Sequence, residues 1–190
     1  TPLIRFNFEG LRSQHTEIYL KLENLQPSGA FKLRGAVNAI KLADPVQLDK
    51  GVWTASSGNM ALAVATAARN FGIDCTAVVA DITPKAKLDA IEKLDAKIIK
   101  VPWLEILEIA RVHRFSGMRG LFLHPFSNPD VMAGNATVGL EIVEDLPDVK
   151  AVLVPYGGGG FAASVASAVK HIKPDTRVYA AEVEFGASFS

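Results

Sequence analysis

The chain has 190 residues, 49% of them hydrophobic and 8% aromatic, which is ample material for the buried core of one large or two small domains. Its 20 basic residues balance its 20 acidic residues, and no basic stripe or tail points to nucleic acid or to a membrane surface. The chain has no apolar run of roughly 18 residues, no signal-peptide pattern and only one cysteine, Cys75, so we expect a cytoplasmic globular protein without disulfides.

Short apolar runs alternate with amphipathic runs along the whole chain. In chain order they predict strand 17–23, helix 32–43, strand 51–55, helix 59–71, strand 74–80, helix 84–94, strand 96–101, helix 103–115, strand 120–126, helix 128–146, strand 151–156, helix 160–172 and strand 177–182. The strands are β-branched and almost continuously apolar. This pattern predicts an α/β fold with parallel sheets and helices on their faces.

Local signals set the ends of several of these helices. The Asp44-Pro45 pair stops the first helix, and Asn128 is a candidate cap for the helix at 128–146. After the strand at 177–182 the sequence "VEFGASFS" contains no closing helix. A bare edge of a parallel sheet is a liability, so we expect the fold to be incomplete at its C-terminus.

Four consecutive glycines in "VPYGGGGFAAS" (154–164) follow an apolar strand and precede a helix. Such a loop turns backbone N–H groups toward one point, and the helix N-terminus adds a field that favours an anion. The loop lacks the Gly-Lys-Ser/Thr ending of a triphosphate-binding loop. Gly157, Gly159 and Ala162 fit a dinucleotide fingerprint, and Glu182 stands where its ribose-binding acid would, so a nicotinamide enzyme remains open on this segment alone.

A second turn between a strand and a helix lies in "TASSGNMALAVA" (54–65). Ser56 or Ser57 is a candidate helix cap, and the N–H groups of residues 57–59 are candidates to hold an anion. Two anion-binding turns together indicate a ligand with two anionic ends, such as an amino-acid carboxylate and a cofactor phosphate.

Lys32 is flanked by Phe31 and Leu33. Desolvation in such a setting lowers the pKa of a lysine and frees its amine as nucleophile or base. On its own, the pattern also fits a surface lysine whose stem lies on apolar neighbours. With the two turns, however, a lysine amine, a monophosphate site and an amino-acid site are the three requirements of pyridoxal phosphate (PLP) catalysis.

The sequence resembles the fold-type II PLP enzymes, in the branch of threonine/serine dehydratases and serine racemases. The resemblance rests on "TPLIR" (1–5), "YLKLENLQPSGAFKLRGA" (19–36), "TASSGNMALAVA" (54–65), "HPFSNPDVMAGNATVGLEI" (124–142), "VPYGGGGFAASVASAVK" (154–170) and "YAAEVE" (179–184). A dinucleotide site accounts for neither the Lys32 segment nor the Ser57 segment. The resemblance implies two three-layer αβα domains with parallel sheets: a large PLP-binding domain of residues 1–36 and 133–190, incomplete at its C-terminus, and a small mobile domain of residues 37–132.

The resemblance also implies roles for single residues. Lys32 matches the lysine that binds the cofactor and moves the substrate α-proton, and Phe31 matches a neighbour of the cofactor. Asn59 matches the partner of the ring hydroxyl. The substrate carboxylate is expected on Ser56, Ser57, Gly58 and Asn59, the cofactor phosphate on Gly157, Gly158, Gly159 and Gly160, and a divalent cation at Glu182.

Two positions depart from the family pattern. Met60 stands where a histidine is usual, and the later acidic partner of the cation site is replaced near Gly186 and Ser188. The four histidines show no metal-ligand spacing, and we assign no catalytic role to His15, His113, His124 or His171.

The activity implied is a dehydratase or ammonia-lyase acting on L-threonine, L-serine or a related β-hydroxy amino acid, which gives a 2-oxo acid and ammonia. Ser57 matches the acid/base that racemases use on the face opposite the lysine. Racemisation, β-replacement and a non-catalytic binding module therefore stay as alternatives. We expect a homodimer or homotetramer with an amino-acid substrate and no nucleic-acid or membrane partner.

Overall fold

The computed structural model describes residues 1–7 and 16–184. The strands are β1 (Leu3–Arg5), β2 (Tyr19–Lys21), β3 (Val52–Ala55), β4 (Cys75–Ala80), β5 (Lys97–Val101), β6 (Leu121–Phe122), β7 (Ala151–Pro155) and β8 (Arg177–Ala181). The helices are α1 (Lys32–Leu42), α2 (Pro45–Leu48), α3 (Asn59–Phe71), α4 (Lys85–Glu92), α5 (Trp103–Val112), α6 (Pro129–Asp145) and α7 (Gly160–Ile172), with a 3-10 turn at Glu23–Leu25. His15, Gly186 and Ser188 lie outside the described residues.

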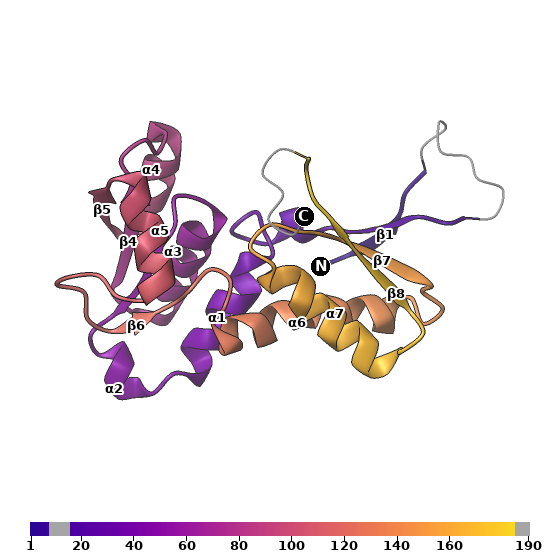
Figure 1. The fold of residues 1–190 in the computed structure, drawn as a ribbon. Coiled ribbons are helices and arrows are strands. Elements are labelled where there is room, and N and C mark those ends of the chain that lie inside the picture. The colour runs from indigo at the N-terminus through magenta and orange to yellow at the C-terminus, as the bar shows by residue number, and fades with distance from the viewer. Residues whose placement is uncertain (8–15, 185–190) are drawn as a thin grey trace.

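A parallel four-stranded sheet in the order β5-β4-β3-β6 forms one end of the molecule (Figure 1). Its side chains alternate between two cores, as the two-residue period of a strand requires. Val52 and Ala77 pack with α1, α3 and α4 on one face, whereas Trp53 and Val78 pack with α5 on the other. Helices therefore cover both faces of this sheet, which confirms the predicted three-layer arrangement.

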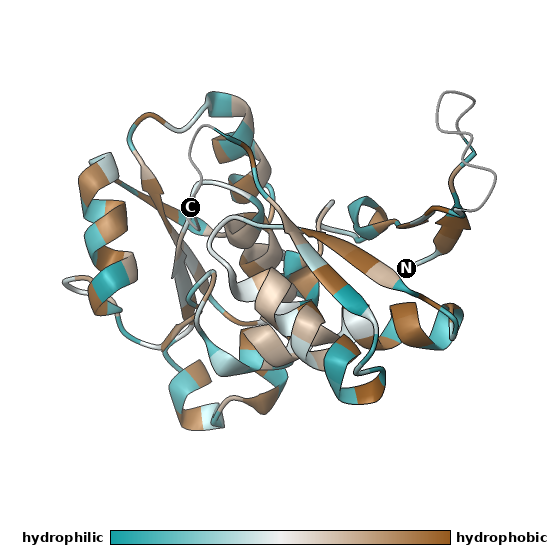
Figure 2. Cartoon of the chain, turned by 45° about the vertical axis from the view of Figure 1, so that its right-hand side comes forward, coloured by the Kyte–Doolittle hydropathy of each residue, from teal (hydrophilic) through white to brown (hydrophobic). Residues whose placement is uncertain are grey.

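The strands β7 and β8 pair in parallel at the other end of the molecule, beside α6 and α7 (Figure 1). Val152, Val154 and Val165 belong to a separate core under these two strands. Figure 2 shows apolar segments along both β7 and β8. The opposite face of the pair exposes large apolar side chains, with 72% of Leu153 and 47% of Tyr179 accessible.

The predicted strand at 17–23 pairs as β2, but its partner is β1 in antiparallel register, with Ile4 opposite Leu20. The parallel pattern predicted throughout the chain is therefore wrong for this pair. The first residues of the chain were not predicted as a strand because three residues carry no readable period.

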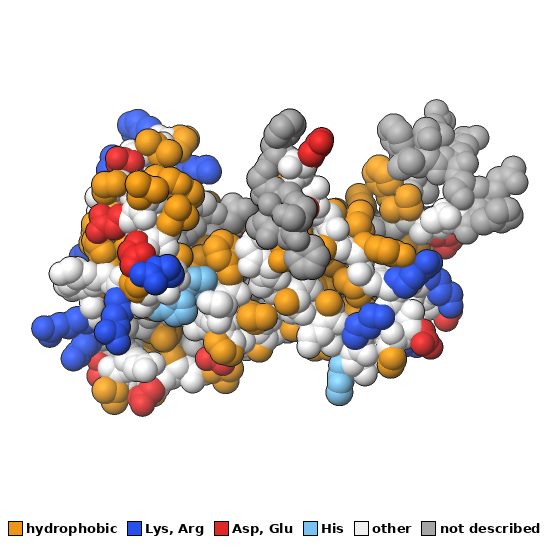
Figure 3. Space-filling model, in the orientation of Figure 1, with side chains coloured by type: hydrophobic (Ala, Val, Ile, Leu, Met, Phe, Trp, Pro, Cys, Tyr) orange, Lys and Arg blue, Asp and Glu red, His pale blue; other side chains and the backbone are white. Residues whose placement is uncertain are grey.

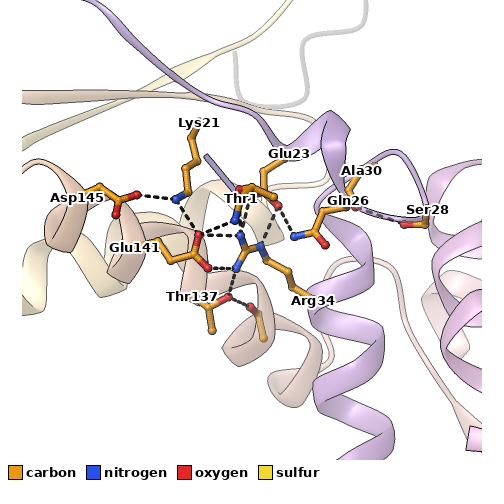
Figure 4. Close-up of polar contacts among 11 residues, drawn as sticks. Thr1, Lys21, Glu23, Gln26, Ser28, Ala30, Arg34, Thr137, Glu141 and Asp145 are labelled. Atoms are coloured by element: carbon orange, nitrogen blue, oxygen red, sulfur yellow. Dashed lines mark hydrogen bonds and ion pairs between the residues drawn. The ribbon is translucent and has the colours of Figure 1, made fainter. Parts of the chain in front are cut away.

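A network of charged side chains ties the N-terminal segment to α1 and α6 (Figure 4). Arg34 binds the carboxylates of Glu23 at 2.8 Å and Glu141 at 2.5 Å. Lys21 binds Glu141 at 2.7 Å and Asp145 at 2.9 Å. Because Arg34 lies two residues after Lys32, the network fixes the first turn of the helix that carries that lysine.

Helices α1 and α6 approach each other through glycines. A Cβ at Gly35 would lie 2.7 Å from the Val131 carbonyl oxygen, and one at Gly134 would lie 2.4 Å from the Arg34 carbonyl oxygen. Neither position therefore has room for a side chain. This close contact joins the part of the molecule around β3 to the part around β7.

Most predicted element bounds agree with the structure to within a few residues, and the helices at 59–71 and 160–172 agree at both ends. Asn128 caps α6 as predicted, accepting from the Val131 N–H at 2.9 Å. Asp44 ends α1 but also caps the short helix α2, which was not predicted. The helix at 103–115 ends earlier, at Val112, because His113 adopts a left-handed conformation with φ of 57°.

No helix within residues 1–7 and 16–184 is long and apolar enough to cross a membrane. Figure 3 shows hydrophobic side chains gathered over the end of the molecule that α4 and α5 form. The exposed apolar residues there are Ile82, Trp103, Leu104 and Leu107.

Candidate active site

Lys32 begins helix α1, and its ammonium group is enclosed by aromatic rings and a backbone carbonyl. Lys32 Nζ donates a hydrogen bond of 2.6 Å to the Pro125 carbonyl oxygen. The centroids of the Phe31 and Phe126 rings lie 5.1 Å and 5.0 Å from the same atom. Burial disfavours the charged form and lowers the pKa of Lys32 to about 8. A substantial fraction of this amine is therefore neutral near pH 8 and able to act as nucleophile or base.

Phe31 connects the Lys32 helix to the start of α7. Its ring stacks on the Phe161 ring with centroids 3.7 Å apart and an interplanar angle of 15°. Phe161 is the second residue of α7 and directly follows the four glycines. The stack thus brings Lys32 and the glycine loop to the same place, although they are more than 120 residues apart in the sequence. A contact between Phe31 and a cofactor stays a prediction.

The glycine loop runs from the end of β7 into α7. Gly159 has a φ of +78° and forms the N-terminal cap position of the helix, where no side chain accepts from the helix N–H groups. A Cβ at Gly158 would lie 2.4 Å from the Phe126 ring, and one at Gly160 would lie 2.1 Å from the Phe126 carbonyl oxygen. The backbone of the loop therefore packs directly against Phe126, which only glycines allow. Glycines likewise let the backbone of a loop approach a phosphate closely.

The turn after β3 is held by its serines, but not as predicted. Ser56 Oγ accepts from the Gly58 N–H at 3.2 Å. Ser57 Oγ accepts from the Ala80 N–H at 2.8 Å and lies 2.7 Å from the Thr83 hydroxyl. Helix α3 begins after Gly58, and no side chain caps it. The prediction that Ser56 or Ser57 caps this helix is wrong, because both hydroxyls bind the turn itself and the neighbouring strand end.

The first turn of α3 consequently keeps its N–H groups for another acceptor. Asn59 is its first residue and its side chain is exposed, whereas the Met60 side chain is 2% accessible and packs in the core. Met60 therefore replaces the usual histidine with a buried apolar contact. The roles predicted for Ser56, Ser57, Gly58 and Asn59 toward a substrate carboxylate stay predictions.

The β3 turn and the Lys32 contacts lie at one edge of the four-stranded sheet. Strands β3 and β6 are parallel neighbours, and the buried Thr54 hydroxyl donates to the Leu123 carbonyl at 2.8 Å. The serine turn follows β3, and the segment 123–127 follows β6. Because parallel strands end at the same edge, the turn and the Lys32 partner Pro125 leave the sheet side by side.

Phe126 lies between Lys32 and the glycine loop, so one aromatic ring spans the distance from the amine to the loop. A hollow of about 520 Å³ adjoins the loop and is lined by Phe126, Tyr156, Gly159 and Gly160 among others. Pro125 and Phe126 were not predicted as site residues, although both lie in the predicted strand 120–126 and in the motif "HPFSNPDVMAGNATVGLEI" (124–142) that carries the resemblance.

Glu182 follows β8, and the structure gives no support for a cation there. Within residues 1–7 and 16–184 no group of three or more His, Cys, Asp or Glu side chains is arranged to hold a metal ion. The positions named as its later partners, Gly186 and Ser188, lie outside the described residues. The divalent cation stays a prediction.

The fold and the site define an α/β protein in which a partly desolvated lysine and a glycine-rich loop at a helix N-terminus both lie beside Phe126. The family model of pyridoxal-phosphate dependent enzymes matches residues 1–190, and the chain belongs to that family. This confirms the resemblance and the cofactor inferred from the sequence motifs.

Individual relatives agree with this assignment. The chain is 44% identical over 171 residues to an L-threonine ammonia-lyase of Thermotoga maritima, covering 88% of this chain and 42% of that protein. A serine racemase structure from Dictyostelium discoideum matches with a TM-score of 0.81 and 38% identity, over 88% of this chain and 55% of that one. A threonine deaminase structure from Solanum lycopersicum matches with a TM-score of 0.79 and 36% identity, over 90% and 50%. The chain spans about half the length of these relatives.

The residues present fit pyridoxal phosphate. Its aldehyde requires an amine with a neutral fraction, which Lys32 provides. Its phosphate requires backbone donors at a helix N-terminus that no side chain caps, and the glycine loop leads into such a terminus, where the Gly160 N–H donates to the Gly158 carbonyl oxygen at 3.0 Å.

Proposed function

We propose that this protein is a PLP-dependent dehydratase, or ammonia-lyase, acting on L-threonine, L-serine or a related β-hydroxy amino acid. The observation that carries the proposal is the partly buried Lys32 amine, which donates to the Pro125 carbonyl oxygen and lies one aromatic ring away from the glycine loop. The names of the Thermotoga and Solanum relatives support this reaction class over other PLP chemistry.

When bound, pyridoxal phosphate supplies an electron sink that stabilises negative charge at the substrate α-carbon. Residues 157–160 and the N-terminus of α7 would hold its phosphate, and Lys32 would hold its aldehyde. Lys32 Nζ, then free and partly neutral, accepts the α-proton. The uncapped N–H groups at the start of α3 orient the substrate carboxylate.

Several side chains keep water from the amine. Pro125 is buried, and the rings of Phe31 and Phe126 flank Lys32 Nζ. Exclusion of water keeps the pKa of Lys32 low, so a fraction of the amine is in its basic form near neutral pH. Over the whole reaction the substrate loses its α-proton and β-hydroxyl as water, and hydrolysis of the remaining C–N bond gives the 2-oxo acid and ammonia.

Racemisation is the second candidate, and the similarity to the Dictyostelium serine racemase supports it. A racemase requires an acid/base on the face opposite Lys32, and Ser57 is the predicted group. The Ser57 hydroxyl, however, already accepts from the Ala80 N–H and shares a hydrogen bond with Thr83. This engagement favours elimination over racemisation.

The remaining predictions belong to the same proposal. The exposed apolar side chains of Trp103, Leu104 and Leu107 support assembly into a homodimer or homotetramer (Figure 3). Helix α1 contributes Leu33 and Ile40 to a single core, so it spans the predicted domain boundary at residue 36. Movement of the smaller domain and a cytoplasmic location stay predictions.

The test is turnover with added pyridoxal phosphate. We expect release of 2-oxo acid and ammonia from L-threonine or L-serine within a panel of β-hydroxy amino acids, measured by coupled reduction of the oxo acid. Formation of the D-enantiomer without oxo acid would support racemisation. Turnover only with O-acetylserine and sulfide would support β-replacement. No turnover with any of these would remove the proposal.

A further inference from the structure

His124 is a buried histidine that the proposed chemistry does not use. It lies two residues after β6, with 7% of its surface accessible. Its Nδ1 atom accepts from the backbone N–H groups of Phe126 at 3.0 Å and Ser127 at 2.9 Å, and the Ser127 hydroxyl lies 3.0 Å away. Its Nε2 atom lies 3.1 Å from the Ala110 carbonyl oxygen at the end of α5. One imidazole ring thus joins the loop after β6 to α5.

These contacts define the protonation of the ring. Nδ1 faces two backbone donors and accepts only when it carries no proton, whereas Nε2 faces a carbonyl and must donate. Burial lowers the pKa of His124, and the nearby charges of His113 and Lys32 lower it further, against the hydrogen bond to Ala110. His113 belongs to the C-terminal cap of α5, with its ring centroid 4.7 Å from that of His124. The neutral ring with its proton on Nε2 is therefore the form that holds the loop.

The residues that His124 holds are those that enclose Lys32. Pro125 has no N–H group, so only its neighbours can hold it in place. The N–H groups of Phe126 and Ser127 both donate to His124 Nδ1. Pro125 in turn accepts from Lys32 Nζ at 2.6 Å, and the Phe126 ring lies 5.0 Å from that atom. The chain of contacts runs from α5 through His124 and the loop to the amine.

We propose that His124 is a positioning residue for Lys32: it holds residues 125–127 so that the Pro125 carbonyl and the Phe126 ring enclose the amine. This inference rests on the proposed function, in which that amine carries the cofactor and moves the α-proton. It gives a role to a histidine for which the sequence analysis assigned none in catalysis.

Two polar substitutions separate the two sides of the imidazole. The amide oxygen of Asn in His124→Asn stands near the Nδ1 position and still accepts from the loop. The amide of Gln in His124→Gln stands near the Nε2 position, so it still reaches Ala110 but leaves the loop N–H groups without an acceptor. His171→Asn, at an exposed histidine on α7, is the matched control.

The measurement is the pH dependence of acetylation of Lys32 by acetic anhydride in the chain without cofactor, followed by peptide mass spectrometry with Lys50 as internal standard. Wild type is expected to show a midpoint near pH 8. His124→Gln is expected to raise the midpoint by about one unit or more, which leaves roughly tenfold less reactive amine at pH 7. His124→Asn and His171→Asn are expected to keep the wild-type midpoint.

An unchanged midpoint in a folded His124→Gln chain would overturn the inference, and so would equal shifts in the Gln and Asn variants. The titration is independent of cofactor loading, which is measured separately as borohydride-fixed pyridoxal phosphate on Lys32. If the wild type binds cofactor and His124→Gln keeps the wild-type midpoint of Lys32 acetylation, only the inference about His124 is refuted. Wild type that fails to load removes the proposed function and leaves the titration result for His124 standing.

Discussion

Arg34 Nη1 lies 2.5 Å from Glu141 Oε1, and this contact joins the helix that begins with Lys32 to the C-terminal part of α6 (Figure 4). The same guanidinium binds Glu23 at 2.8 Å through a second nitrogen. Hydrogen bonding to Arg34 lowers the pKa of Glu141 to about 2, with burial acting in the opposite direction. The position of Lys32 thus depends on ion pairs that lie outside the site itself.

Substitution of Arg34 tests that dependence. The Arg34 side chain is 11% accessible, so Arg34→Met leaves the Glu23 and Glu141 carboxylates partly buried without their shared cation. We expect a loss of about 3 kcal/mol in the free energy of unfolding, measured by urea denaturation. Arg111→Met is the control, because the Arg111–Glu108 pair is exposed and its loss should leave the free energy of unfolding almost unchanged. Equal effects of the two substitutions would contradict the account.

Substitution of Lys32 should stabilise the chain in a pH-dependent way. Burial lowers the pKa of Lys32 to about 8 from 10.5, so the folded chain releases this proton at a lower pH than the unfolded chain. The buried charge therefore costs its full penalty below pH 8, and the penalty disappears as the pH rises to about 10.5. Without cofactor, Lys32→Met should raise the free energy of unfolding by roughly 2–3 kcal/mol at pH 7 and leave it almost unchanged above pH 10.5. Urea denaturation at several pH values measures this difference. A gain that does not vary with pH would show that Lys32 is not desolvated.

The glycines of the loop should differ in their tolerance of alanine. At Gly160 the added Cβ meets the backbone oxygen of Phe126 at 2.1 Å, so the backbone must move. At Gly158 it meets the Phe126 ring, which is exposed enough to turn aside, and at Gly157 it meets nothing within 4 Å. Gly160→Ala should therefore weaken cofactor binding at least tenfold and cost about 2 kcal/mol of stability, Gly158→Ala less, and Gly157→Ala least. Cofactor fluorescence and thermal unfolding give both values, and any other order would refute the packing described.

Ser57→Ala separates a structural role from a catalytic one. It removes the acceptor of the Ala80 N–H and should cost about 1–2 kcal/mol of stability. If Ser57 only holds the turn, elimination should continue at a reduced rate set by the looser carboxylate site. Chiral chromatography checks the other possibility, since loss of a racemase activity with elimination unchanged would assign Ser57 to proton transfer.

Much of the fold was predictable because its elements are strongly periodic. The helix at 59–71 has alanines on its buried side and Gly72 after its last turn, so both of its ends follow from local rules. The pair β1–β2 did not follow, because three-residue strands are set by their partners rather than by their own pattern. The prediction that Ser56 or Ser57 caps α3 was wrong for a similar reason. The Ser57 hydroxyl binds Ala80 and Thr83, which lie more than 20 residues away in the sequence.

The site was predictable as a set of segments but not as a set of contacts. Lys32 and the glycine loop stand out by residue type and by neighbours. That Phe31 stacks on Phe161, or that His124 holds the loop against Lys32, requires contacts between residues that lie many positions apart. No local sequence signal carries such pairings.

The most direct test of the central claim is reduction with borohydride after incubation with pyridoxal phosphate, followed by peptide mass spectrometry. Lys32 should carry the added pyridoxyl phosphate, the untreated protein should absorb at the wavelength typical of a lysine-bound cofactor, and Lys32→Met should show neither. Stable labelling of another lysine with Lys32 unmodified, or a colourless protein that takes up no label, would contradict the assignment of Lys32 as the cofactor-binding amine.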